Sequence, residues 1–178
     1  MKALKFIVIV LGTLVFLILI VALFVPKEFK YEKTITVNAP IDSVWLNVNS
    51  LSALDKWSPW NDHDPNIKKK MTGTDGTVGA MQSWESEIVG SGSQTIETVI
   101  KPTLIETELN FYKPHKSQGK AFIKLMPKGI ETRVTWGMTG NMPYPFNIMT
   151  IFMNMEKTMG KDWENGLMKL KKMSEKKH

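Results

Sequence analysis

The residue with the clearest chemical potential in this sequence is Glu156, a carboxylate that falls on the apolar face of a predicted helix. When the segment after Pro145 is projected at about 100° per residue, Glu156 lies roughly 20° from Leu167. A carboxylate that faces a cavity needs a partner or a raised pKa. We therefore expect Glu156 to bind a polar head or a cation of a ligand, or to act as a general acid or base. In the alternative, the helix bends or starts late, and Glu156 reaches solvent or pairs with a sheet residue such as Arg133.

Several apolar and aromatic side chains of the sequence could line a pocket for an apolar ligand. Methionine thioethers adapt to varied apolar shapes, and tryptophan indoles can shape the mouth of a cavity. Ordinary core packing is the alternative for the same side chains. The residues predicted to bind the ligand are Glu156, Met149, Phe152, Met159, Trp163, Trp136, Met138, Trp57 and Trp84.

Other chemical signals in the sequence are weaker. Catalysis requires at least two polar groups that converge in the pocket, and Tyr112 or His63 could join Glu156 there. Asp62-His63-Asp64 holds three possible metal ligands, but an Asx-rich turn before Pro65 explains this spacing better. Cysteine is absent, and no Gly-x-Ser-x-Gly, His-Glu-x-x-His or Walker A sequence occurs. We predict no metal, no cofactor and no catalytic residue beyond the candidate Glu156.

The net charge of +6 suggests anionic partners, but the positive residues are spread along the chain. The exceptions are Lys68 to Lys70 and a basic tail from Lys169 to Lys177. No zinc-finger or RNP-type motif accompanies the charge, so we do not expect a nucleic-acid partner. The tail either contacts acidic lipid headgroups or forms a solvated helix end.

An uncharged apolar run from Phe6 to Val25 is long enough to cross a hydrocarbon core of about 30 Å. A cleaved signal peptide has a shorter apolar region and a small-x-small site, whereas here the run leads straight into Pro26-Lys27. We therefore predict an uncleaved single-pass signal anchor. The short stub with Lys2 and Lys5 stays in the cytoplasm most easily, which favours an extracytoplasmic location for the rest of the chain.

The remaining sequence predicts one α+β domain. A strand over Tyr31 to Val37 is followed by two short helices, and a meander of alternating strands then runs to Thr139. In the strand around Leu109, apolar residues alternate with Glu106 and Glu108, so we expect one face of the sheet to be exposed to solvent. The segment after Pro145 reads as a helix of roughly 27 residues, which must cover the apolar face.

Three short motifs give these elements a family resemblance. They are Val37-x-Ala39-Pro40-x-x-x-Val44-Trp45, Trp57-x-Pro59-Trp60 and Gly166-Leu167-x-x-Leu170. In their order and spacing they resemble the START-like (SRPBCC) superfamily, most closely the polyketide cyclase/dehydrase-type branch with its membrane-anchored members. The resemblance implies a helix-grip fold, in which a curved antiparallel sheet wraps around a long C-terminal helix and a cavity between them accepts an apolar small molecule. It does not imply a reaction.

The predicted organisation is a stub at 1–5, a transmembrane anchor at 6–25, a linker at 26–29, a START-like domain at 30–173 and a basic tail at 174–178. The linker spans about 14 Å when extended, which keeps the domain against the bilayer. The leading hypothesis is a membrane-tethered protein that binds an apolar small molecule or lipid. One alternative is an enzyme of cyclase or dehydratase type that uses Glu156. Another is a structural or interaction domain whose cavity is filled by side chains.

Overall fold

The computed structural model of the chain describes residues 1–152 and 154–176, and it divides into two compact units. The N-terminal unit comprises Met1–Phe29 and Gly140–Asn154. The sheet unit comprises Lys30–Thr139 and Met155–His178. The last two residues of the predicted basic tail, 177–178, lie outside the described residues.

The N-terminal unit contains a long helix, α1 (Lys2–Phe24), and a short 3-10 helix, η1 (Phe146–Ile151). Helix α1 ends where Val25 takes an extended conformation (φ −82°, ψ 132°), because Pro26 disfavours the helical conformation of the residue before it. Among the described residues, α1 is the one helix that is long and apolar enough to cross a membrane. Most of its large side chains are exposed.

A seven-stranded sheet forms most of the sheet unit, and its order is β1-β7-β6-β5-β4-β3-β2. The registers from β2 to β6 are antiparallel between successive strands. The outer ends of β1 and β7 belong to the N-terminal unit. The strands are β1 (Glu28–Val37), β2 (Lys68–Thr72), β3 (Met81–Ser86), β4 (Gly90–Ile100), β5 (Leu104–Lys113), β6 (Ser117–Lys128) and β7 (Glu131–Asn141).

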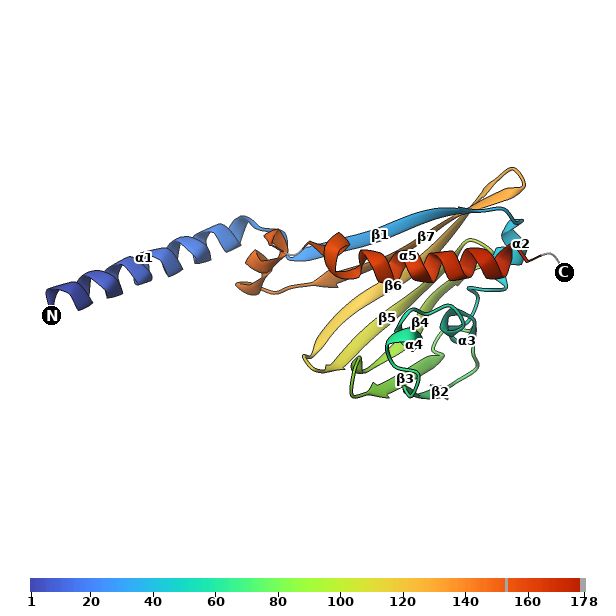
Figure 1. Cartoon of the computed structure of the whole chain (residues 1–178), viewed down its shortest axis with the longest axis horizontal. Coiled ribbons are helices and arrows are strands. Elements are labelled where there is room, and N and C mark those ends of the chain that lie inside the picture. Colours follow the sequence, from blue (N-terminus) through green and yellow to red (C-terminus); the bar gives the residue numbers. More distant parts are fainter. Residues whose placement is uncertain (153, 177–178) are drawn as a thin grey trace. The chain divides into compact units, whose positions relative to one another are not determined.

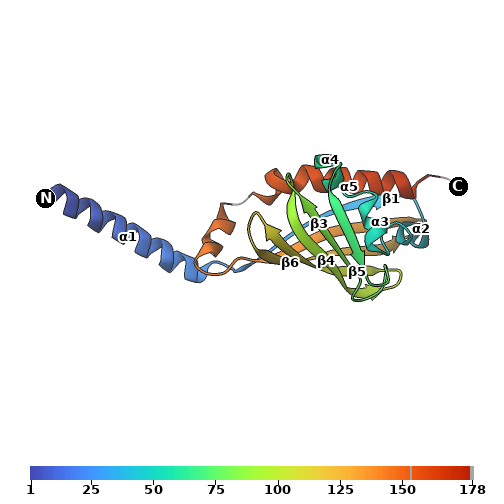
Figure 2. The same ribbon diagram turned by 90° about the horizontal axis from the view of Figure 1, so that it is seen from below.

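Four α-helices complete the sheet unit, and the longest of them, α5, runs along one face of the sheet (Figure 1; Figure 2). The hydroxyl of Ser50 accepts a hydrogen bond from the amide of Ala53, which caps the start of α3. The carboxylate of Asp75, from the turn after β2, accepts two more from the amides of Leu51 and Ser52. The helices are α2 (Ile41–Trp45), α3 (Leu51–Asp55), α4 (Trp60–His63) and α5 (Met155–Ser174).

The closing helix differs from the sequence prediction. It is 20 residues long and begins at Met155, whereas periodicity predicted one helix from Pro145 onward. The segment ahead of it forms η1 instead, because Asn147 is buried there and its side chain binds backbone carbonyls of the N-terminal unit. Tertiary contacts thus override the helical pattern at 146–152.

The core of the sheet unit lies between α5 and the sheet, as the predicted architecture requires. Trp163, Leu167 and Leu170 of α5 are buried against sheet residues that include Val134 and Ile105. Gly166 allows α5 to approach closely, since a Cβ at this position would lie 2.8 Å from Cζ3 of Trp136. The predicted α+β helix-grip fold is confirmed.

Candidate functional site

A cavity of about 500 Å³ lies within the sheet unit, between the sheet, α5 and the α3–α4 segment. This volume falls in the range of roughly 300–1,000 Å³ that is typical of small-molecule sites. The sheet contributes Gln82, Trp84, Gln94, Ile105, Thr107, Leu109, Phe111, Ala121, Phe122, Ile123, Trp136 and Met138. The helices and the segments between them contribute Leu51, Leu54, Asp55, Trp57, Ser58, Trp60, His63, Ile67, Met159, Asp162 and Trp163, among others.

Four tryptophans form one wall of this cavity. The rings of Trp136 and Trp163 are stacked, with centroids 4.4 Å apart and an interplanar angle of 16°. Trp57 meets Trp136 edge-on at 5.0 Å, and Trp60 meets Trp163 edge-on at 6.1 Å. The indole N–H of Trp57 donates to the carbonyl of Asn47 at 2.9 Å, which fixes the orientation of that ring. This wall is therefore aromatic and largely apolar, and contacts between neighbouring rings hold it together.

A second aromatic group lines the cavity from strands β3 to β5. Trp84 and Phe111 pack edge-to-face with centroids 5.8 Å apart. Gly92 of β4 lies directly beneath Trp84, and a Cβ there would lie 2.4 Å from Cζ2 of the indole. The strand needs glycine at this position for the close approach of the ring.

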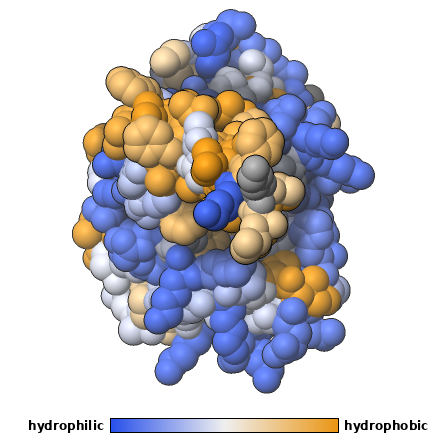
Figure 3. All heavy atoms as spheres, turned by 90° about the vertical axis from the view of Figure 1, so that its left-hand side faces the viewer, coloured by the Kyte–Doolittle hydropathy of each residue, from blue (hydrophilic) through white to orange (hydrophobic). Residues whose placement is uncertain are grey.

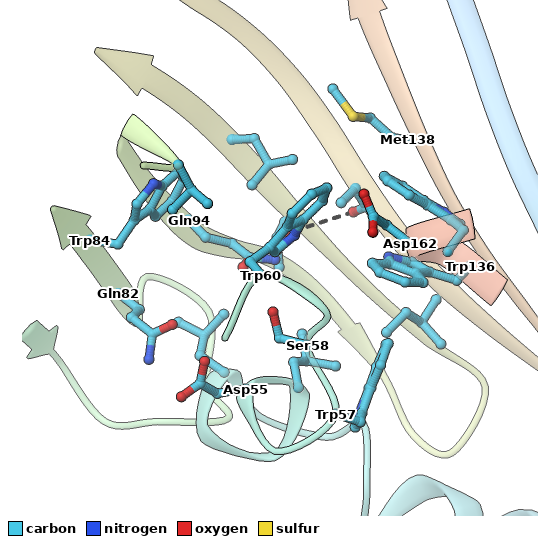
Figure 4. Close-up of a pocket in the computed structure, with 18 of the residues that line it drawn as sticks. Asp55, Trp57, Ser58, Trp60, Gln82, Trp84, Gln94, Trp136, Met138 and Asp162 are labelled. Atoms are coloured by element: carbon cyan, nitrogen blue, oxygen red, sulfur yellow. Dashed lines mark hydrogen bonds between the residues drawn. The ribbon is translucent and has the colours of Figure 1, made fainter. Parts of the chain in front are cut away.

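Two polar clusters interrupt the apolar lining. Nε2 of His63 lies 3.0 Å from Oδ1 of Asp162, and the imidazole stacks on Trp60 with centroids 5.9 Å apart. In the other cluster, Nζ of Lys69 bonds Oδ1 of Asp55 and Oδ1 of Asn61. Figure 4 shows Asp162 on the side of Trp136, and Asp55 on the side of Gln82.

A neutral hydrogen bond adds to the polar part of the wall. Nε2 of Gln94 on β4 donates to Oγ1 of Thr107 on β5 at 2.9 Å. The Thr107 hydroxyl lies against the carbonyl of Ala121 at 3.4 Å. A ligand would thus find an apolar surface with a few fixed polar groups, which is the usual composition of a small-molecule site.

Six of the residues predicted from sequence lie on the cavity wall. They are Trp57, Trp84, Trp136, Met138, Met159 and Trp163. Met149 and Phe152 belong to the N-terminal unit, where both side chains are exposed. The prediction had extended one helical face through 146–154, where the chain forms η1 and then leaves the helix.

Glu156 lies outside the cavity lining, in the first turn of α5, with its side chain 64% exposed. Its Oε1 pairs with Nζ of Lys33 at 2.8 Å, and its Oε2 accepts a hydrogen bond from the Tyr31 hydroxyl at 2.6 Å. These two bonds lower the pKa of Glu156, whereas a carboxylate in an apolar cavity would have a raised pKa. Burial and the bond to Glu156 raise the pKa of Tyr31. The sheet partner of Glu156 is therefore Lys33 on β1.

The residues of the Asp62-His63-Asp64 run point to separate partners. Asp62 pairs with Lys169 at 2.5 Å, while His63 pairs with Asp162. Asp64 accepts a hydrogen bond from the Ser86 hydroxyl at 2.5 Å. Across residues 1–152 and 154–176, no group of three or more acidic or histidine side chains is arranged to hold a metal ion.

Tyr112, the other suggested partner for catalysis, does not line the cavity. Its hydroxyl is 2.9 Å from the hydroxyl of Ser93.

Asp162, Asp55 and Lys69 were missed from the sequence. Asp162 lies three residues after Met159 and therefore shares its side of α5, a signal that a search limited to apolar side chains overlooks. Successive side chains of a strand point to opposite faces, so Lys69 faces the cavity while Lys68 and Lys70 face the other side of β2. Treating the three lysines as one charged run hides this difference. The pairing of Lys69 with Asp55 has no local sequence signal.

A curved antiparallel sheet, a long C-terminal helix and an apolar cavity between them define the helix-grip class of proteins. The family described as polyketide cyclase / dehydrase and lipid transport matches residues 28–175, and the chain belongs to this family. The predicted membership of the START-like (SRPBCC) superfamily is thereby confirmed. No curated protein matches the chain.

Solved structures agree with the fold. A protein from Nitrosospira multiformis is 18% identical, with a TM-score of 0.60, and the match covers 83% of this chain and 97% of that one. A protein from Mesorhizobium loti is 11% identical, with a TM-score of 0.61 over 84% of this chain and 99% of that one. Truncated norcoclaurine synthase from Thalictrum flavum is 14% identical, with a TM-score of 0.62 over 85% and 96%. At these identities the likeness concerns the fold alone.

Proposed function

We propose that this protein binds an apolar small molecule or lipid in the cavity of its sheet unit, while α1 tethers it to a membrane. The cavity carries the proposal: about 500 Å³ of space is lined mainly by aromatic and aliphatic side chains. Burial of an apolar ligand there is favourable by roughly 25 cal/mol per Å² of apolar surface removed from water. The open volume argues against the alternative of an interior filled by side chains.

The polar clusters indicate how a ligand would be oriented. The stacked aromatic rings of Trp136 and Trp163 suit a ligand with an extended or planar apolar body, such as an isoprenoid or a quinone-like ring. His63 with Asp162, or Lys69 with Asp55, would receive a polar end, because both pairs line the cavity and hold hydrogen-bonding groups. A ligand with one polar end and an apolar body fits this distribution best.

The tether supports a lipid-derived ligand. Helix α1 ends at Phe24 and β1 begins at Glu28, so three residues lie between them. Such a link spans at most about 14 Å between its flanking residues. The protein would therefore take its ligand from the adjacent leaflet, or return it there. Lys2 and Lys5 ahead of the apolar run favour a cytoplasmic N-terminus and an extracytoplasmic sheet unit.

Native mass spectrometry of the full chain in a mild detergent tests the binding proposal. We expect a co-purifying apolar molecule in wild-type protein and in Glu108→Trp, but much less of it in Leu109→Trp. Leu109 lines the cavity, so the larger indole would fill part of it, whereas the neighbouring Glu108 is not part of the lining. Equal retention by the two variants, or no bound molecule after addition of several lipid extracts, would contradict the proposal.

Catalysis is a second candidate function, and the contact between His63 and Asp162 favours it. A carboxylate bonded to one imidazole nitrogen orients the ring as an acid or base toward a bound molecule. This pair lines the cavity, whereas Glu156 does not. If the pair acts in a reaction, the molecule retained by His63→Ala will differ chemically from that retained by wild type. An identical molecule in both would leave simple binding as the function.

A further inference from the structure

The segment 140–152 of the N-terminal unit carries an unusual exposed surface. It contains no charged residue, although charged residues make up 22% of the whole chain. Four of its large apolar side chains are between 52% and 81% exposed: Phe146, Met149, Ile151 and Phe152. A soluble surface rarely leaves such a group of side chains together in water.

Asn147 fixes this segment to the end of α1. The side chain is fully buried, and its Nδ2 donates to the carbonyls of Ala22 and Val25, each at 2.7 Å. The last carbonyls of a helix have no partner within the helix. In a membrane, where water is scarce, an unsatisfied carbonyl costs several kcal/mol. Asn147 therefore supplies the donors that the end of a membrane-spanning helix lacks.

Two further contacts within the unit join the segment to the residues that directly follow α1. The amide of Met142 donates to the carbonyl of Lys27 at 2.7 Å. The ring of Phe29 lies against Gly140, where a Cβ would be 2.3 Å from Cζ of the ring. The exposed apolar side chains of η1 are thus held beside the C-terminal end of α1, close to Lys27, the first charged residue after that helix.

We propose that segment 140–152 lies in the lipid headgroup region of the bilayer, with the exposed side chains of η1 and Phe152 inserted beside the C-terminal end of α1. This inference rests on the proposed membrane tether. The occupant is lipid because the apolar surface of η1 joins that of α1 within one unit. Figure 3 looks onto the N-terminal end of α1 and shows hydrophobic side chains gathered on this face of the molecule.

The chemistry of the segment matches this location. Tyrosine and tryptophan are enriched where the hydrocarbon meets the headgroups, and Tyr144 is exposed in this segment. Phe146 and Phe152, which are also exposed, are typical of the apolar side chains that interfacial elements insert. Interfacial elements bury their apolar side chains about 5–10 Å into the boundary. The segment would thus be a second membrane contact in addition to the span.

Site-directed spin labelling tests the proposal directly, because the chain has no cysteine of its own. Nitroxides are placed on four single variants of the full chain in phosphatidylcholine vesicles: Phe152→Cys and Met149→Cys in the segment, Leu17→Cys in α1, and Ile130→Cys in the turn between β6 and β7. Ile130 is the matched aqueous control, since it is an apolar residue 86% exposed in the sheet unit. Collision rates with oxygen and with a water-soluble nickel chelate report the depth of each label.

We expect the Leu17 label to collide mainly with oxygen and the Ile130 label mainly with the chelate. The labels at 149 and 152 should show chelate collisions several-fold below those of Ile130. If these two labels match Ile130 while Leu17 is in lipid, the interfacial location is wrong and the tether stands. If Leu17 also matches Ile130, the membrane tether itself is wrong, and the interfacial location falls with it.

Discussion

Two glycines of α5 lie in different surroundings, and their replacement by alanine should have opposite effects on stability. Alanine favours a helix interior over glycine by about 1 kcal/mol, and both variants share this gain. At Gly166 the new Cβ would lie 2.8 Å from Cζ3 of Trp136 and 3.3 Å from Cδ of Pro59. Neither atom is the end of a flexible chain, so overpacking of about 1–3 kcal/mol opposes the gain.

At Gly160 the atom nearest to a new Cβ is Oε1 of Glu156, at 2.6 Å. This carboxylate ends a flexible side chain that is 64% exposed, so it can move away from a new Cβ. The movement weakens its ion pair with Lys33, but such an exposed pair contributes little to stability. The Tyr31 hydroxyl, at 3.1 Å, must shift by a few tenths of an ångström. We expect Gly160→Ala to be neutral or up to about 1 kcal/mol more stable than wild type.

The gain in helix propensity is the same in both variants. The difference between their free energies of unfolding therefore measures the contact of α5 with Trp136. A difference of about 1–3 kcal/mol corresponds to unfolding midpoints roughly 2–12 °C apart for a domain of this size. Thermal unfolding of the full chain in vesicles, followed by tryptophan fluorescence, gives both midpoints. If the unfolding midpoint of Gly166→Ala equals or exceeds that of Gly160→Ala, Gly166 is not in close contact with Trp136, and this packing of the cavity wall is wrong.

Two further predictions concern carboxylates outside the cavity. Lys33 and Tyr31 lower the pKa of Glu156, so its contribution to stability is present above its unfolded pKa of 4.5 and disappears as the pH falls through the lower folded value. The midpoint difference between wild type and Glu156→Gln should therefore shrink from pH 7 to pH 3, and a difference that grows would contradict this ion pair. Burial opposes ionisation of Asp75, but hydrogen bonds from Ser52, Leu51 and Gly76 lower its pKa overall. Asp75→Ala should cost about 1–2 kcal/mol in chemical denaturation, with a smaller loss in Asp75→Asn, which keeps one acceptor oxygen.

The fold was predictable because its signals are local and repeated. Alternation in strands such as that around Leu109 orients the sheet, and turn residues mark where each strand ends. The same periodicity brought Trp136 and Met138 to the cavity face of β7. Their role in ligand binding stays a prediction.

The site was less predictable, because its polar part depends on contacts between distant segments. His63 meets Asp162 across 99 positions of sequence, and neither residue carries a local signal of the other. Met149 and Phe152 were placed at the cavity because helical periodicity was extended across 146–152, where burial of Asn147 interrupts the helix. A hydrophobic pattern alone does not reveal such an interruption.

The aromatic wall also has an optical consequence. Trp57, Trp136, Trp163 and Trp60 follow one another through ring contacts of 4.4–6.1 Å, so light absorbed by one indole is shared among them. The short distance between the stacked rings of Trp136 and Trp163 should couple their electronic transitions. All four line the space where a ligand would lie. The protein therefore contains its own spectroscopic reporter of cavity occupancy, which needs neither label nor known ligand.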